Sequence, residues 1–170
     1  MRIRNIFIFV VALCVMLSAS VAVAAEYDYK DMIPVLPDSI GGMAKSGDPD
    51  GGNVQTSGET WAAVEQRYSD GEGRVRLMVV AGAVAPQVQK FRQLSLMEVE
   101  TGEAIIKSTK ISGREAVFQI RKDRAGGTLG IAVQNDVVAA IETNQEVSEK
   151  ELISLGEEIP VEEIADCVTK

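Results

Sequence analysis

Histidine is absent from this sequence of 170 residues, and cysteine is nearly so. The first absence excludes Ser-His-Asp and Cys-His catalysis, zinc sites built on imidazole, and pH sensing by histidine. Of the two cysteines, Cys14 lies in the apolar N-terminal segment. If that segment is removed, Cys167 has no partner for an intramolecular disulfide. It is then either a half-buried thiol on a terminal helix or the site of a disulfide between two molecules.

Positive charge is also scarce, because 17 Lys and Arg stand against 25 Asp and Glu, for a net charge of −8. An acidic surface repels phosphate backbones and anionic lipid, which argues against nucleic-acid binding and stable membrane association. The glycine-rich segments match neither the P-loop pattern nor the dinucleotide-binding fingerprint. We therefore expect no cofactor and no enzymatic activity.

The N-terminus has the three parts of a secretory signal peptide. Arg2 and Arg4 form a positive segment, a twelve-residue apolar run extends from Ile6 to Leu17, and an Ala-x-Ala cleavage site ends at Ala24. Cleavage there, or one residue later, predicts a periplasmic or secreted chain with 15 basic and 25 acidic residues. The alternative is an uncleaved anchor, because the apolar stretch through Ala25 approaches the roughly 20 residues of a membrane span.

The composition divides the chain into a signal peptide (1–24), an N-terminal arm with an exposed loop (25–59) and a folded domain (60–170). The arm contains two closely spaced prolines, which interrupt regular structure. The segment 44–58 is rich in Gly, Asp and Ser and is expected to be the exposed loop.

From residue 60 onward, apolar alternation predicts strands, and helical spacing predicts helices. The expected strands are 61–68, 74–80, 104–110, 116–120, 129–133 and 137–143. A helix is expected over 86–97, a second after the capping-box residue Ser148, and a short one after Pro160. Tight turns between consecutive strands favour antiparallel pairing. The predicted fold class is α+β, with an antiparallel β-sheet of about six strands and helices packed on its faces.

The last hairpin is expected to lie in the middle of this sheet, because it is rich in Gly and Ala and small side chains allow a helical layer to approach. A two-residue turn at Asn135-Asp136 would pair Val133 with Val138. One face would then carry Leu129, Ile131, Val133, Val138 and Ala140.

Four segments carry a resemblance to a known fold: Leu36–Gly42, Ile111–Ala116, Gly127–Val133 and Val137–Ile141. With these turns and strands, the stretch from about Leu36 to Val168 resembles the Mog1/PsbP-like fold, an antiparallel sheet between helical layers. It is also similar to small exported bacterial proteins of unknown function. The resemblance implies a non-enzymatic accessory module that binds a partner protein.

One candidate metal site lies in the arm. Asp48, Asp50 and Glu59 have spacings found in a calcium-binding loop. Such a loop needs an oxygen ligand at position five and glycine at position six, where this chain has Gly52 and Asn53. The two interpretations of this segment are a calcium-binding loop and a solvated Asp/Gly turn.

The candidate partner-binding residues are Trp61, Arg74, Arg76 and Arg121. If the three arginines share the outer face of the sheet, they form a local basic patch suited to an acidic partner. An exposed tryptophan would be an interface anchor, because aromatic residues are favoured there. The alternatives are that the three arginines are ordinary charged residues on the surface of the sheet and that Trp61 lies in the core.

Together these features predict an exported, non-enzymatic accessory or binding protein of the bacterial envelope, with a protein partner. One alternative is a metal-dependent or carboxylate-based hydrolase, which requires a cleft where carboxylates converge. Another is a calcium-binding or purely structural envelope protein. The sequence leaves the oligomeric state open.

Overall fold

The computed structural model of the chain describes residues 27–56 and 58–169. The expected signal peptide, its cleavage site at Ala24 and the alternative anchor lie outside these residues. Within them, no helix combines the length and the apolar character needed to cross a membrane.

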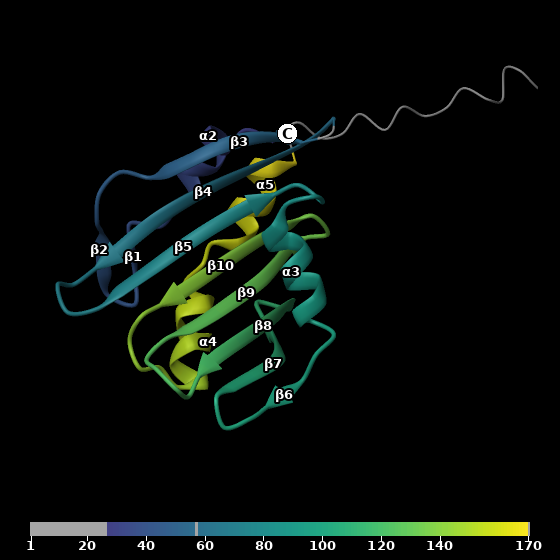
Figure 1. Ribbon diagram of the computed structural model, residues 1–170. Coiled ribbons are helices and arrows are strands. Elements are labelled where there is room, and N and C mark those ends of the chain that lie inside the picture. Colours follow the sequence, from purple (N-terminus) through teal and green to yellow (C-terminus); the bar gives the residue numbers. More distant parts are fainter. Residues whose placement is uncertain (1–26, 57, 170) are drawn as a thin grey trace, which may run out of the picture.

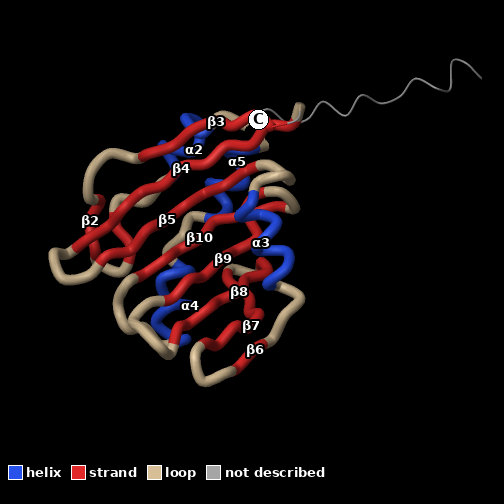
Figure 2. The backbone as a smooth tube through the Cα atoms, viewed as in Figure 1, coloured by secondary structure: helices blue, strands red, loops and turns tan. Residues whose placement is uncertain are grey.

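Ten strands in the described part of the chain form one antiparallel sheet (Figures 1 and 2). In chain order they are β1 (Ser39–Ile40), β2 (Met43–Lys45), β3 (Asp50–Thr56), β4 (Glu59–Ser69), β5 (Arg74–Ala81), β6 (Val99–Glu100), β7 (Ala104–Ile111), β8 (Arg114–Arg121), β9 (Gly127–Gln134) and β10 (Val137–Thr143). Across the sheet the order is β1-β2-β4-β5-β10-β9-β8-β7-β6, and β3 pairs with the same edge of β4 as β2 does.

The antiparallel α+β class is confirmed, but the predicted sheet of about six strands with helices packed on its faces is wrong: the described residues form mostly a ten-stranded sheet, and helices cover one face much more than the other. β1, β2 and β6 have only two or three residues, too few to show apolar alternation. β3 occupies much of the segment 44–58 that was expected to be a loop. Its backbone pairs with β4 over seven residues although most of its side chains are exposed. The predicted six-stranded sandwich is thereby corrected to a larger sheet.

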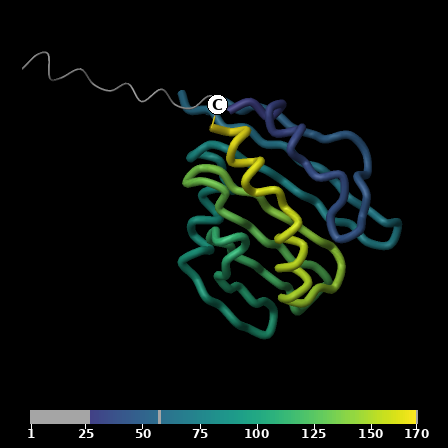
Figure 3. Tube along the Cα trace, turned by 180° about the vertical axis from the view of Figure 1, so that it is seen from behind, coloured from purple at the N-terminus to yellow at the C-terminus, as the bar shows by residue number. Residues whose placement is uncertain are grey.

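Helices lie on the two faces of the sheet unequally. The rear face in Figure 1 packs against α2 (Tyr29–Met32), the 3-10 turn η1 (Ile33–Val35), α4 (Glu149–Glu157) and α5 (Val161–Val168). Figure 3 shows the last two running diagonally across that face. We call this the covered face. The opposite, or α3, face carries α3 (Pro86–Leu94), which packs on β5 and β10.

Helices α3 and α4 begin where the sequence predicts, the first at a proline and the second after a capping serine. Pro86 is the first residue of α3, where a missing N–H costs nothing. Ser148 caps α4: its Oγ accepts from the Glu151 N–H (3.3 Å), and its own N–H donates to Glu151 Oε2 (2.8 Å). The predicted capping box is confirmed. α3 ends at Leu94, three residues before its expected end at residue 97.

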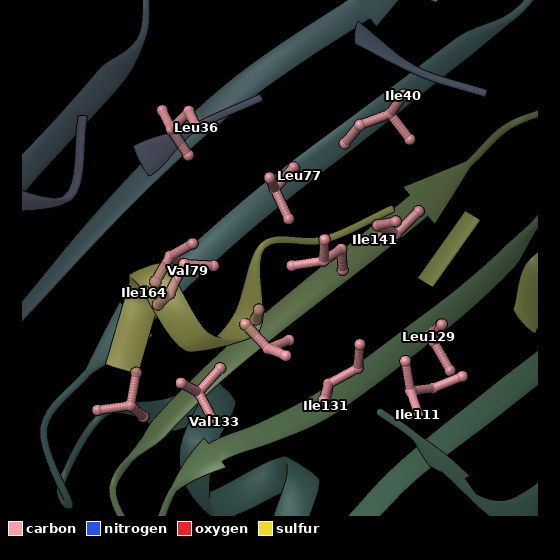
Figure 4. Packing of buried hydrophobic residues seen from close by; sticks show 14 of the residues in the cluster. Leu36, Ile40, Leu77, Val79, Ile111, Leu129, Ile131, Val133, Ile141 and Ile164 are labelled. Carbon is pink, nitrogen blue, oxygen red and sulfur yellow. The ribbon is translucent and has the colours of Figure 1, made fainter. Parts of the chain in front are cut away.

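The main core lies between the sheet and the covering helices (Figure 4). The alternating side chains of β5 and of the β9–β10 hairpin point into it, and Ile164 of α5 closes it from the helical side. A smaller buried cluster lies under α3 and contains Val80, Ala85, Val88, Phe91, Val117 and Val138. Each strand in the middle of the sheet therefore buries side chains on both faces, which fits its near-continuous apolar sequence.

The β9–β10 hairpin does lie in the middle of the sheet, but its predicted register is wrong. Gln134 pairs with Val137, and the ladder then shifts so that Ala132 pairs with Val138. This bulge leaves Val133 without a direct partner in β10. As a result Val138 lies on the α3 face with Ala140, while Val133 remains on the covered face. The bulge thus supplies the α3 face with apolar residues that the two-residue turn would have placed on the other side.

Close approach of α3 depends on Gly130 of β9. A Cβ atom at this position would lie 2.9 Å from Cδ2 of the Phe91 ring. The absence of a side chain therefore makes room for the ring, as the small-residue content of this hairpin predicts.

Candidate functional site

α3 covers only part of its face of the sheet and leaves the other end of the central strands without a helix above it (Figure 1). One row of side chains crosses that uncovered end: Arg76 on β5, Glu142 on β10, Thr128 on β9 and Gln119 on β8 are consecutive cross-strand partners. All four are half-buried. This polar row separates two hollows in the surface.

The first hollow, the arginine hollow, lies at the end of the β4–β5 hairpin and has a volume of about 600 Å³. Its lining includes Arg67, Arg74 and Arg76 and a single carboxylate, Glu142, together with Ser46 and Asn144. Hydroxyl, amide and guanidinium groups are hydrogen-bond donors, so this lining favours an anionic occupant.

Two of the three arginines form an ion-pair network. Arg67 and Arg76 are direct cross-strand partners, an arrangement that destabilises a sheet when the charges are uncompensated. Glu65 compensates both, with Oε1 3.0 Å from Arg67 Nε and Oε2 3.2 Å from Arg76 Nη1. Arg76 also donates to Glu142, and this hydrogen bond raises the pKa of Arg76, against the opposing effect of burial.

The second hollow, the α3 groove, lies between α3 and the sheet and has a volume of about 250 Å³. Its lining is largely apolar: the sheet forms the floor and α3 one wall, with Met78, Phe91, Leu94, Val117, Gly130, Val138 and Ala140. Its charged residues are Arg76, Lys90, Arg121 and Glu142. Arg76 and Glu142 line both hollows, which therefore adjoin, and we call the two together the sheet trough.

The trough is locally basic in an acidic protein. Five cationic side chains line it, against one carboxylate. Within residues 27–56 and 58–169, no carboxylate lies within 4.0 Å of the charged groups of Arg74, Lys90 or Arg121. These three charges are available to an acidic partner.

The structure therefore brings three of the sequence-predicted residues together. Arg74 and Arg76 line one hollow, and Arg76 and Arg121 line the other. Trp61 is half-buried on the same face, where it packs against the cluster under α3 and contributes to the small core. Arg114, in contrast, has an internal partner in Glu162 of α5 (2.7 Å).

The candidate calcium ligands are not brought together. Asp48 precedes β3, Asp50 begins it opposite Glu65, and Glu59 lies beside Thr56 at the other end of the same hairpin. Six residues of strand separate the two ends by about 20 Å. In the part of the chain that the structure describes, no group of three or more Asp, Glu, Cys or His side chains could hold a metal ion.

Cys167 is half-buried on α5, as one of the two alternatives predicts, and its Sγ donates to the Ile164 carbonyl (3.1 Å). The N-terminal aromatic Tyr27 is engaged within the molecule. Its hydroxyl donates to Asp136 Oδ2 (2.7 Å), and burial together with this carboxylate raises the pKa of Tyr27 well above its ordinary value. Neither residue lies at the trough.

Sequence reasoning missed several residues of the trough: Arg67, Met78, Lys90, Gln119, Thr128 and Glu142. Arg67 could have been found, because alternation along β4 places it on the same side as Trp61. Glu142 and Thr128 could not, since their place beside Arg76 depends on the pairing of β10 with β5 and β9.

No protein-family model, curated protein or solved structure matches the chain. The resemblance to the Mog1/PsbP-like fold stays a prediction, and the geometry of the trough is the basis for the function proposed below.

Proposed function

We propose that this chain is an exported, non-enzymatic accessory protein of the bacterial envelope that binds a partner protein through its sheet trough. The observation that carries the proposal is the unequal covering of the sheet. The covered face is buried under four helical segments, whereas the α3 face keeps a hollow with an apolar floor and uncompensated cations. Binding surfaces combine these features, because apolar area supplies affinity and charged groups fix orientation.

The charges of the trough support recognition rather than acid–base chemistry. Glu65 and Glu142, the carboxylates in its ion-pair network, both contact the Arg76 guanidinium. Both carboxylates are thus engaged as ion-pair partners of a single arginine. General acid–base catalysis would instead require two groups held in different protonation states.

Export rests on the pattern of the leader. A positive segment, a short apolar run and a small-residue cleavage site occur in that order. Intact mass spectrometry of the protein from its native cell tests this part of the proposal. We expect a chain that begins at Ala25 or Glu26, and a membrane-bound chain that still begins at Met1 would contradict it.

Partner binding is tested by photo-crosslinking in the native cell. A photoreactive residue replaces Gln119, which lines the α3 groove, and in a control strain it replaces Ser154, which is exposed on α4. We expect a discrete crosslinked protein from the Gln119 position that is absent from the Ser154 position. No crosslink at Gln119, or the same products from both positions, would contradict binding through the trough.

A further inference from the structure

The sheet trough has the length of a short extended peptide. Its two hollows meet at Arg76 and Glu142 and together reach from Arg67 on β4 to Arg121 on β8. These strands are separated by β5, β10 and β9, so the trough crosses about 19 Å of sheet at roughly 4.8 Å per strand. An extended chain of about six residues spans this distance.

Its charges are spaced along that length. Arg74 on β5 and Arg121 on β8 lie at two ends of the trough, three strands or about 14 Å apart, and neither has a carboxylate partner among the described residues. Arg76, two residues from Arg74 on the same strand, is already compensated by Glu65 and Glu142. Guanidinium groups pair with carboxylates through two parallel hydrogen bonds, so each end favours an acidic side chain.

The α3 groove, whose floor lies beyond the polar row from Arg74, accepts an apolar side chain. Met78 and Ala140 form part of its floor, and Phe91 and Leu94 form its α3 wall. Its volume of about 250 Å³ is below the range of about 300–1,000 Å³ that small-molecule sites have. A side chain inserted from a bound peptide fits this space better than a complete ligand of that class.

Resting on the proposed function, we propose that the sheet trough binds an extended acidic segment of the partner protein. Carboxylates of the segment pair with Arg74 and Arg121, and one large apolar side chain of the same segment enters the α3 groove. Charge complementarity selects this occupant, because the trough concentrates cations in a chain with an excess of acidic residues.

A second copy of the chain is disfavoured as the occupant. Its α4–α5 layer is acidic, with seven acidic residues and one lysine between Glu149 and Asp166. However, the apolar side chains Leu152, Val161 and Ile164 of that layer are buried against its own sheet. Its half-buried Ile153 and Leu155 also pack against that core, so the layer exposes charge but no apolar side chain for the groove.

The test measures fluorescence anisotropy of labelled synthetic hexapeptides with the exported protein. The probe is Asp-Glu-Ser-Leu-Gly-Glu, and the controls replace its leucine by serine or all its acidic residues by lysine. We expect the probe to bind at low salt and to weaken strongly at about 0.3 M NaCl, where the Debye length is below 10 Å. Both control peptides are expected to bind about tenfold or more weakly than the probe.

The matched variants are Arg74→Glu and Arg121→Glu on one side and Lys150→Glu on the other. All three change the charge equally, but Lys150 lies on α4, away from the trough. We expect the two arginine variants to lose about tenfold or more in affinity and Lys150→Glu to bind like the parent. Circular dichroism checks that each variant folds. If Arg121→Glu fails to fold, Arg121→Gln takes its place.

Equal binding of acidic and basic peptides, or an equal loss in Lys150→Glu, would overturn the acidic-segment inference. Salt-sensitive dimerisation without probe binding would also overturn it, in favour of a second copy. If Gln119 crosslinks a partner but the peptides do not discriminate, the proposed function stands and this inference fails. If the peptides discriminate but Gln119 crosslinks nothing, the trough recognises acidic segments and the proposed cellular function fails.

Discussion

The two faces of the sheet share the same strands but differ in how completely helices cover them. On the covered face, side chains such as Leu77, Ile131 and Ile141 are fully buried beneath α2, α4 and α5. On the α3 face, the equivalent central residues Met78 and Ala140 remain half-buried beside a groove. The comparison shows that the central strands can present apolar side chains on both faces of the sheet. The helices, however, bury these side chains completely on only one face.

The layers also differ in charge. The α4–α5 layer carries seven acidic residues and one lysine, whereas the trough carries five cations and one carboxylate. An acidic outer layer favours solubility and repels other anions. The excess negative charge of the sequence is thus concentrated away from the surface that we assign to binding.

The largest expected effect distinguishes the two apolar faces directly. Ile141→Ala removes a side chain that is 0% exposed from the main core, and such substitutions cost about 2–5 kcal/mol of unfolding free energy. Met78→Ala on the α3 face removes a half-buried side chain and is expected to cost about 1 kcal/mol. Urea unfolding measures both through the midpoint at constant m value. Equal losses would contradict the assignment of Met78 to an open groove.

The next effect tests how tightly α3 packs. Gly130→Ala places a Cβ 2.9 Å from the Phe91 ring, so we expect a loss of about 1–3 kcal/mol from overpacking. Gly52→Ala is the matched control, because a Cβ there meets no atom within 4 Å. Adding Phe91→Leu to Gly130→Ala should recover part of the loss in urea unfolding. If Gly130→Ala lost the same unfolding free energy with and without Phe91→Leu, the strain would not come from contact with the Phe91 ring.

A smaller effect concerns the arginine pair of the trough. Glu65→Gln leaves Arg67 and Arg76 directly opposite each other with less compensation, and we expect a loss of about 0.5–1 kcal/mol at low salt. Thermal unfolding should show this loss disappear at about 1 M NaCl, because salt screens the repulsion. Glu115→Gln is the control, since no cation lies within 4.0 Å of Glu115 among the described residues. Salt-independent destabilisation would mean that Glu65 acts through packing.

The smallest effect concerns the acidic covering layer. Hydrogen bonds from the side chain and backbone of Ser148 hold the pKa of Glu151 below its ordinary value. A carboxylate with a lowered folded-state pKa stabilises the fold above its unfolded pKa of about 4.3. This contribution is lost as the pH falls through the folded-state pKa.

Glu151→Gln should therefore lower Tm slightly at neutral pH, and the difference from the parent should shrink below about pH 4. Glu149→Gln removes a charge from the same helical turn without the Ser148 bonds and should show a smaller difference. A Tm difference for Glu151→Gln that persists at pH 3 would contradict the capping role of its charge.

The elements with a clear period could be predicted from the sequence. The strands that became β4, β5 and β7–β10, the helices α3, α4 and α5, and the capping box at Ser148 are all observed. Each buries one apolar stripe or face, which leaves a periodic pattern in the chain. β3 was missed because its exposed side chains carry no such pattern.

The candidate site was predicted only in part. Alternation along β5 puts Arg74 and Arg76 on one side of the strand, and the structure confirms that they share a hollow. The position of Arg121 relative to them depends on β8 being three strands away across β10 and β9. The α3 groove depends further on the bulge that turns Val138 towards α3.

The sequence by itself determined which segments form the main strands and helices and where α3 and α4 begin. These features follow from contacts between residues close in the chain, through side-chain period, turn residues and capping hydrogen bonds. Only the tertiary structure decided the order of the strands, which face the helices cover and which charges meet in the trough. Those outcomes depend on pairing between distant segments, where a single bulge in β9–β10 reverses the direction of the side chains that follow it.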